Sequence, residues 1–187
     1  MDAPIISVIT VCYNVASSIE KTMLSVLNQT YKNLEYIIID GNSTDGTVDI
    51  IKRYAERLTF WISEPDNGIY DAMNKGIVKA TGEFLIFMNA GDQFLNEKVL
   101  SKCLPYFLQE IDVISGMGYL SGQKWIPAKA SDLSVAFFLK RSLNHQATFI
   151  NRKLFQDNLY RTDLKIVGDS VFFFQALIMD NASYVDI

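Results

Sequence analysis

Apolar residues are arranged along the first half of the chain in blocks that predict strands and helices in alternation. Four runs are almost entirely apolar, as expected for strands buried on both faces of a sheet: residues 5–10, 34–39, 58–62 and 84–88. The segments between them repeat apolar residues at helical spacing: residues 19–27, 48–55 and 70–80. This alternation predicts an α/β fold with a mostly parallel sheet and right-handed crossovers.

The second half of the chain has a less regular pattern. Its predicted helices are residues 99–108 and 171–179, and its predicted strands are short: residues 113–120, 124–126, 147–150 and 183–187. Residues 127–145 fit neither pattern. We expect one domain over residues 1–187, and a strand that begins at Ser183 indicates that the sequence ends before the domain does.

Composition and charge narrow the classes of function. The 187 residues carry 17 basic and 21 acidic side chains, and the net charge of −4 argues against a nucleic-acid partner because it repels a phosphate backbone. The two cysteines, Cys12 and Cys103, form no C-x-x-C pair, which fits a reducing cytoplasm. No apolar run approaches the roughly 20 residues that a membrane span needs, and the N-terminus lacks a signal-peptide pattern. We therefore expect a cytoplasmic protein without a transmembrane segment.

Polar residues follow three of the predicted parallel strands, at the edge where an open α/β sheet binds its ligands. They are Tyr13-Asn14, Asp40-Gly41-Asn42-Ser43 and Asn89-Ala90-Gly91-Asp92. The alternative is that these residues only form turns and cap helices. The turn after the first strand has no glycine, so it lacks the dinucleotide fingerprint, and the phosphate loop G-x-x-x-x-G-K-[ST] is also absent. If phosphates bind, a metal held by a carboxylate must do much of the work.

Several ordered motifs resemble those of family 2 glycosyltransferases of the GT-A fold. They are Pro4–Thr10 with Tyr13-Asn14, then Ser25–Tyr31, Glu35–Thr47 and the run Glu64–Gly76, which reads EPDNGIYDAMNKG. The resemblance runs from about residue 4 to residue 175. It is to the branch that builds bacterial polysaccharides and cell-surface glycans.

The resemblance implies a Rossmann-like sheet flanked by helices, with a nucleotide-binding half over about residues 1–95 and a smaller acceptor-side half over about 96–187. The implied activity is an inverting, metal-assisted transfer of a hexosyl or N-acetylhexosaminyl unit. The donor would be a nucleotide-diphosphate sugar, expected to be UDP-linked, and the acceptor a hydroxyl of a glycan or a lipid-linked molecule. By analogy, the protein could lie peripherally at the inner face of the plasma membrane. A homodimer is left open.

The family's nucleotide-binding positions can be carried over residue by residue. Tyr13 matches the aromatic ring that lies against the base, with a tyrosine at the edge of the core as the alternative. The other matching or neighbouring polar positions are Asn14, Asp40, Ser43, Asp66 and Asp71. Asp71 could equally cap its own helix. Many relatives have a second Asp where this chain has Gly41, and this departure leaves base selectivity open.

Two acidic residues match positions with chemical roles. Asp92 is the only acidic residue in the motif at residues 89–92, and it would hold Mn²⁺ or Mg²⁺ together with diphosphate oxygens and water. Metal affinity should then depend on bound donor nucleotide. Asp169 matches the family's general base, which takes the proton of the acceptor hydroxyl, although it could instead cap the following helix. His145, the only histidine, would contact the acceptor or the donor phosphates unless its role is structural.

Two other classes of function remain open at this point. A sugar-nucleotide pyrophosphorylase would need a basic, glycine-rich phosphate loop near the first strand, which is missing. A non-catalytic module that binds a nucleotide or a glycan would need only the binding residues.

Overall fold

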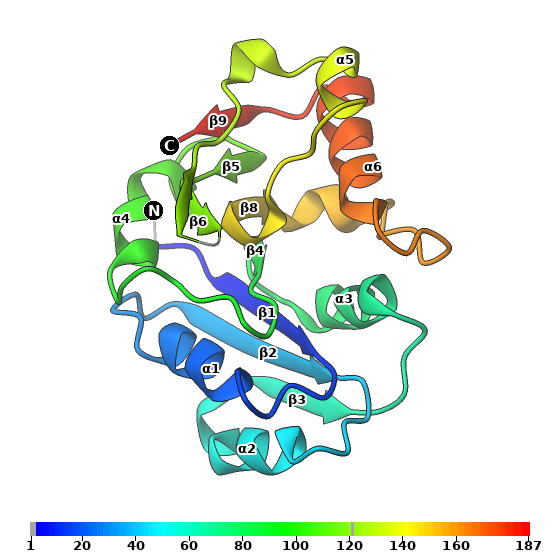
Figure 1. Ribbon diagram of the computed structural model, residues 1–187. Coiled ribbons are helices and arrows are strands. Elements are labelled where there is room, and N and C mark those ends of the chain that lie inside the picture. The colour runs from blue at the N-terminus through cyan, green and yellow to red at the C-terminus, as the bar shows by residue number, and fades with distance from the viewer. Residues whose placement is uncertain (1–2, 121) are drawn as a thin grey trace.

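The computed structural model describes residues 3–120 and 122–187, and its centre is a twisted sheet with helices on both faces (Figure 1). The strands are β1 Ile6–Cys12, β2 Leu34–Asp40, β3 Phe60–Ser63, β4 Phe84–Phe87, β5 Val113–Ser115, β6 Gly118–Leu120, β7 Gln123–Trp125, β8 Thr148–Asn151 and β9 Tyr184–Asp186. The helices are α1 Ile19–Leu27, α2 Thr47–Arg53, α3 Ile69–Lys79, α4 Val99–Phe107, α5 Val135–Phe138 and α6 Gly168–Phe174.

Seven strands form the main sheet in the order β3-β2-β1-β4-β8-β5-β9. The first four in that order run parallel, which confirms the fold expected from the alternating pattern. Strand β8 is antiparallel to both of its neighbours, β4 and β5, while β9 runs parallel to β5. The antiparallel strand marks the boundary between the regular first half and the irregular second half.

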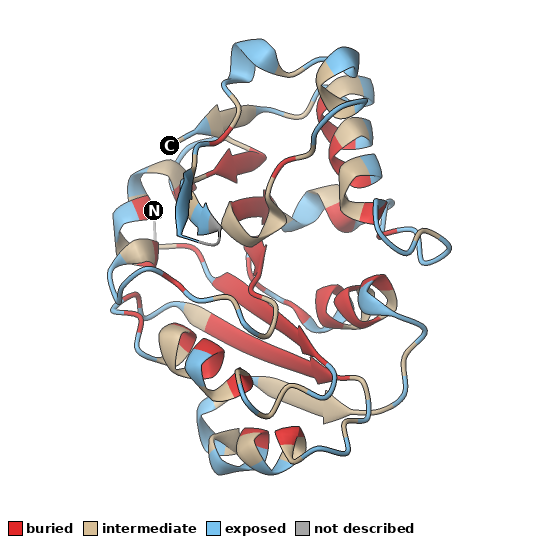
Figure 2. Ribbon diagram, in the orientation of Figure 1, coloured by how far each residue is buried: buried red, intermediate tan, exposed pale blue. Residues whose placement is uncertain are grey.

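The helices divide the core into two layers. Helices α1, α2 and α4 pack on one face of the sheet, where their apolar side chains join Ile6 and Val8 of β1. Helices α3 and α6 pack on the other face with Ile9 and Val11 of the same strand. Every residue of β1 is buried, and Figure 2 shows burial concentrated on the central strands. A strand covered on both faces needs a continuous apolar run rather than an alternating one.

The second half departs from two sequence-based expectations. The strand expected over residues 113–120 is broken after Ser115, and its second part pairs with β7 in a separate two-stranded ribbon. Gly116 lies at the break, where its N–H donates to the carbonyl of Ala147 (2.7 Å), and the next residue, Met117, is 56% exposed. The helix expected over residues 171–179 begins earlier, at Gly168, and changes to a π-helix over Gln175–Met179.

None of the helices in the described parts of the chain is long and apolar enough to cross a membrane. The longest α-helix in these parts, α3, has 11 residues.

Candidate active site

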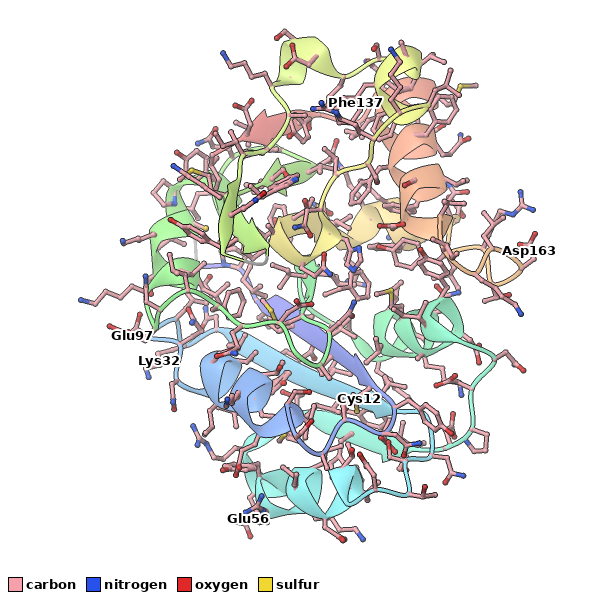
Figure 3. The ribbon with its side chains drawn as sticks, viewed as in Figure 1. Cys12, Lys32, Glu56, Glu97, Phe137 and Asp163 are labelled. Atoms are coloured by element: carbon pink, nitrogen blue, oxygen red, sulfur yellow. The ribbon has the colours of Figure 1, made fainter. Side chains whose placement is uncertain are left out.

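The ends of three neighbouring parallel strands form one edge of the sheet. Cys12 at the end of β1, labelled in Figure 3, pairs with Asp40 at the end of β2, and Asp40 pairs with Ser63 at the end of β3. The segment that follows β4 joins the same edge, because the N–H of Ala90 donates to the carbonyl of Val11 (3.3 Å). The polar residues predicted to meet at this edge therefore do follow strands that end together.

Asp40 lies beneath this edge and is completely buried. Its carboxylate accepts hydrogen bonds from the Ser43 N–H (2.9 Å), the Ser43 hydroxyl (2.5 Å) and the Ser63 hydroxyl (2.6 Å). The Cys12 thiol also points at it, at 3.4 Å, and burial together with this carboxylate raises the pKa of the thiol far above its ordinary value. The side chain of Asp40 thus holds the loop after β2 in shape from within, and its acceptor capacity is already used.

Asn14 and Ser43 tie the first two loops of the edge together. The N–H of Asn14 donates to the hydroxyl oxygen of Ser43 (2.8 Å), and the N–H of Thr44 donates to the side-chain oxygen of Asn14 (2.9 Å). Asn14 has a positive φ of 50°, a conformation that asparagine tolerates better than most residues. Both side chains predicted to bind the nucleotide are therefore engaged between the loops.

Sequence reasoning missed Asp45, which supports the same loops. Its carboxylate accepts from the N–H of Ala16 (2.9 Å) and from the hydroxyl of Thr47 (2.6 Å), and these two bonds lower its pKa. The available signal was weak, because Asp45 is an acidic residue in the turn before a helix but lies one residue before the N-cap position, Gly46.

Tyr13, Gly41 and Asp66 meet on the open side of this edge. The Tyr13 side chain is 62% exposed, whereas Asp66 accepts a hydrogen bond from the N–H of Gly68 (2.9 Å) through one of its oxygens. A Cβ atom at position 41 would lie 2.5 Å from the other Asp66 oxygen and 3.4 Å from Cδ2 of Tyr13. Because residue 41 is glycine, it leaves the space that the Asp66 carboxylate occupies.

Asp71 faces the start of its own helix. Its carboxylate accepts from the N–H of Asn67 (3.0 Å) and lies 3.8 Å from the Lys75 ammonium. Asp71 therefore ties the loop before α3 to the first turn of that helix, and its predicted contact with a nucleotide stays a prediction.

A second polar centre surrounds Asp169, near the start of α6. One carboxylate oxygen lies 2.9 Å from Nδ1 of His145, and the other accepts from the Tyr70 hydroxyl (2.9 Å). The side chains of His145 and Asp169 are only 15% and 14% exposed. Burial alone would raise the pKa of Asp169, but the hydrogen bonds from His145 and from the Tyr70 hydroxyl outweigh it, so the pKa is lowered. Asp169 is therefore ionised at neutral pH.

His145 connects this centre to the turn after β4. Its Nε2 lies 3.1 Å from the amide nitrogen of Asn89. An ionised Asp169 can only accept a hydrogen bond, so Nδ1 carries the proton and Nε2 accepts from the Asn89 amide. This chain of contacts links Asp169 to the turn that also carries Asp92.

The turn at residues 89–92 offers two oxygen groups for a cation. Asp92 is half-buried; burial raises its pKa, and the neighbouring Gln146 and His145 oppose this only in part. The side-chain oxygen of Asn89 is buried and has no hydrogen-bond partner among the described residues. Among residues 3–120 and 122–187, no three or more His, Cys, Asp or Glu side chains form a group that could hold a metal ion. Oxygen ligands suit Mn²⁺ and Mg²⁺, but ligands from a substrate would be needed to complete the shell.

Comparison with known proteins gives a consistent result. The family model described as Glycosyl transferase family 2 matches residues 7–180. An uncharacterized glycosyltransferase of Mycobacterium tuberculosis is 32% identical over an alignment of 197 positions that covers 95% of this chain and 70% of the relative. The putative teichuronic acid biosynthesis glycosyltransferase TuaG of Bacillus subtilis is 37% identical over an alignment of 119 positions that covers 62% of this chain and 47% of TuaG.

Solved structures show the same fold. TarS of S. aureus, in complex with UDP, superposes with a TM-score of 0.79 at 21% identity, covering 97% of this chain and 57% of TarS. The mannosyltransferase PcManGT of Pyrobaculum calidifontis, in complex with GDP-Man and Mn²⁺, superposes with a TM-score of 0.76 at 23% identity, covering 97% of this chain and 54% of that protein. The chain thus spans little more than half the length of these proteins.

Proposed function

The chain belongs to glycosyl transferase family 2, and from this premise we propose that it transfers a sugar from a nucleotide-diphosphate donor to an acceptor hydroxyl with inversion at the anomeric carbon. One observation carries the proposal. Asp169 is a shielded, ionised carboxylate held by His145 and Tyr70, and His145 also contacts the turn of Asp92. A base and a candidate cation site are thereby connected through one side chain.

The nucleoside would bind on the open side of the sheet edge. Tyr13 offers an exposed ring for stacking on the base, and the free oxygen of Asp66 beside Gly41 offers an acceptor. Asp40, Asn14 and Ser43 would act indirectly, by fixing the loops that present these groups. The UDP in the TarS structure supports a UDP-linked donor.

Asp92, with Asn89 beside it, would hold Mn²⁺ or Mg²⁺ together with the donor diphosphate. A divalent cation at this place supplies positive charge that stabilises the departing diphosphate. The oxygen groups of the turn fit such an ion, and the Mn²⁺ in the mannosyltransferase structure supports its presence. Because the turn supplies few ligands, we expect weak binding of the metal without nucleotide.

Asp169 would act as the general base. The O–H bond of the acceptor breaks and its proton passes to the Asp169 carboxylate. The acceptor oxygen bonds to the anomeric carbon, whose bond to the diphosphate oxygen breaks, and the electron pair leaves with the diphosphate. Attack opposite the leaving group inverts the anomeric centre.

The acceptor would be a glycan or a lipid-linked molecule, and the putative role of TuaG in teichuronic acid biosynthesis supports a glycan. The protein would then lie at the cytoplasmic face of the cell envelope, where nucleotide sugars are available. Neither assignment is needed for the chemistry at Asp169.

A turnover assay tests the proposal. The protein is incubated with Mn²⁺ and UDP-glucose, UDP-N-acetylglucosamine or GDP-mannose, and released nucleoside diphosphate is measured with and without glycan acceptors. We expect turnover with at least one donor, a loss of about 100-fold or more in Asp169→Asn, and unchanged UDP affinity in calorimetry. Asp163→Asn is the matched control, because Asp163 is an exposed acid whose ion-pair partner among the described residues is Arg161. UDP binding without any turnover would instead identify a non-catalytic nucleotide-binding module.

A further inference from the structure

Helix α3 carries part of the EPDNGIYDAMNKG motif, and one face of this helix contacts the second half of the chain. Asn74 lies four residues after Tyr70 and therefore on the same side of the helix. The Asn74 amide donates to the carbonyl of Tyr160 (2.8 Å), and its oxygen accepts from the N–H of Tyr160 (3.0 Å). One turn earlier, the Tyr70 hydroxyl reaches the carbonyl of Ile166 (2.8 Å) and the carboxylate of Asp169.

The two contacts anchor both ends of a loop that leads to the base. Residues 161–165 lie between the anchors, and Asp163, labelled in Figure 3, lies in the part of this loop that projects from the molecule. Ile166 itself is 84% exposed, so apolar packing does not hold it in place. The backbone at this position is therefore held mainly through the Tyr70 hydroxyl.

The ring of Tyr70 can lie here only because residue 168 is glycine. A Cβ atom at position 168 would come within 2.8 Å of Cε2 and 2.9 Å of Cδ2 of the ring. These are ring carbons held in the core, since Tyr70 is only 5% exposed, and they cannot yield as a flexible chain end would. Gly168 and Tyr70 therefore form a matched pair immediately next to Asp169.

The Tyr70 hydroxyl has one proton and two acceptors within hydrogen-bond distance. Burial raises the pKa of Tyr70 to about 12, so the hydroxyl keeps its proton at neutral pH. An ionised Asp169 is the stronger acceptor, because bonds to a charged group are about twice as strong as neutral ones. A protonated Asp169 can instead donate to the tyrosine oxygen, while the tyrosine proton turns to the Ile166 carbonyl.

We propose that Tyr70 is a positioning residue for the base, holding the Asp169 carboxyl group in the same place before and after it takes up the acceptor proton. This inference rests on the proposed function. When the proton of the acceptor hydroxyl passes to Asp169, rotation of the Tyr70 O–H bond from Asp169 to the Ile166 carbonyl exchanges donor and acceptor without moving either residue. His145 fixes the other carboxylate oxygen, so the carboxyl group is held from two sides.

The chain offers a matched control for the decisive variant. Tyr160 lies beside Tyr70, with ring centroids 5.5 Å apart, and its buried hydroxyl has no hydrogen-bond partner among the described residues. Tyr70→Phe and Tyr160→Phe remove the same group from the same aromatic cluster, but only the first removes contacts to Asp169 and Ile166.

Three measurements test the proposal on wild type, Tyr70→Phe and Tyr160→Phe. With Mn²⁺ and the three donors named above, we expect Tyr70→Phe to lower kcat about 10- to 100-fold with the donor KM changed less than about twofold. In the wild type the hydrogen bond from Tyr70 lowers the pKa of Asp169. Its loss should raise that pKa, so the acid limb of the pH profile of kcat should move to higher pH. Hydrogen–deuterium exchange of amides 161–169 should become faster. Tyr160→Phe should match wild type in all three.

The outcomes separate this inference from the proposed function. If wild type turns over a donor and Tyr70→Phe keeps its kcat and pH profile, the inference is wrong and the transferase assignment stands. If wild type turns over none of the donors, the proposed function fails for them. Hydrogen–deuterium exchange of amides 161–169 then tests the inference. Equal exchange in the two tyrosine variants then overturns it, whereas faster exchange in Tyr70→Phe alone supports the anchor.

Discussion

Two polar sites are assembled over different distances along the chain. One is the sheet edge where β1, β2 and β3 end, called the donor edge because we propose that it binds the donor. The other is the centre around Asp169, called the base centre because we propose that Asp169 is the base. At the donor edge, the side-chain bonds join adjacent parallel strands, and Asn14 and Ser43 are 29 residues apart. At the base, Tyr70 bonds to Asp169 across 99 residues and Asn89 to His145 across 56. The first site needs only the three neighbouring parallel strands β1, β2 and β3 with their connecting helices, whereas the second needs the two halves of the chain to dock.

This difference predicts which perturbations affect both sites and which affect only one. The donor edge is built over the buried Asp40, so damage there should disturb the fold itself. The base centre depends on polar contacts from α3 and on an aromatic cluster that includes the stacked rings of Phe155 and Phe172, 4.5 Å apart. Loosening those contacts should impair chemistry before it impairs nucleotide binding.

Replacing Asp40 by Asn should have the largest effect on stability. The variant turns one acceptor oxygen into an amide group that faces the donors of Ser43 and Ser63, and at least one buried donor loses its partner. We expect the free energy of unfolding to fall by about 2 to 4 kcal/mol, measured by urea denaturation. Asp49→Asn is the control, because the Asp49 side chain is 85% exposed. An Asp40→Asn variant as stable as wild type would contradict the supporting role.

Replacing Asn74 by Leu should affect the base centre selectively. The change removes both hydrogen bonds to the backbone of Tyr160 and leaves those backbone groups without their partner. We expect a loss of about 1 to 3 kcal/mol in unfolding free energy and a reduced kcat, with UDP affinity unchanged in calorimetry. A parallel loss of UDP affinity would show that the two sites are not separable in this way.

Replacing Gly41 by Asp tests the donor edge without touching the base. The new Cβ would lie 2.5 Å from an Asp66 oxygen, and its carboxylate would add a second negative charge. We expect UDP affinity to fall about tenfold or more, which corresponds to about 1.4 kcal/mol. Gly116→Ala is the control, since its nearest neighbour would be a carbonyl oxygen at 3.5 Å. Unchanged or tighter UDP binding would mean that Asp66 does not need this space.

The regular half of the fold could be predicted from sequence because its strands and helices are encoded by local patterns. The parallel strands β1 to β4 and the polar residues at their ends are confirmed. The break after Ser115 could not be predicted, because it depends on Gly116 bonding to Ala147 in another segment.

The positions of several polar residues could be predicted, but their contacts could not. Tyr13 and Asp66 lie together, and the Asp169 side chain is only 14% exposed, while the roles of all three in binding and catalysis stay predictions. The sequence places Tyr70 only at the start of the helix predicted over residues 70–80, because its bond to Asp169 forms only when the two halves dock. The contacts of His145 with Asp169 and Asn89 could not be predicted for the same reason.

The smallest expected effect belongs to Asp92, and it has opposite signs in the free and bound protein. Burial raises the pKa of Asp92 in the folded state, so its contribution to stability is fully present below the unfolded pKa and is lost as the pH rises through the folded pKa. At pH 7, Asp92→Asn removes the cost of burying an ionised carboxylate. We expect the melting temperature of the nucleotide-free protein to rise by about 1 to 3 °C at pH 7, with a smaller difference near pH 4.

The same variant should lose the stabilisation that UDP with Mn²⁺ gives to wild type, because a ligand raises the melting temperature only as far as it binds the folded state. Differential scanning calorimetry at pH 7, with and without UDP and Mn²⁺, measures both effects in one series. A nucleotide-free variant that melts below wild type would show that Asp92 has a stabilising partner. A variant that keeps its response to UDP and Mn²⁺ would remove Asp92 from the cation site and leave the Asn89 oxygen as the remaining protein ligand of that turn.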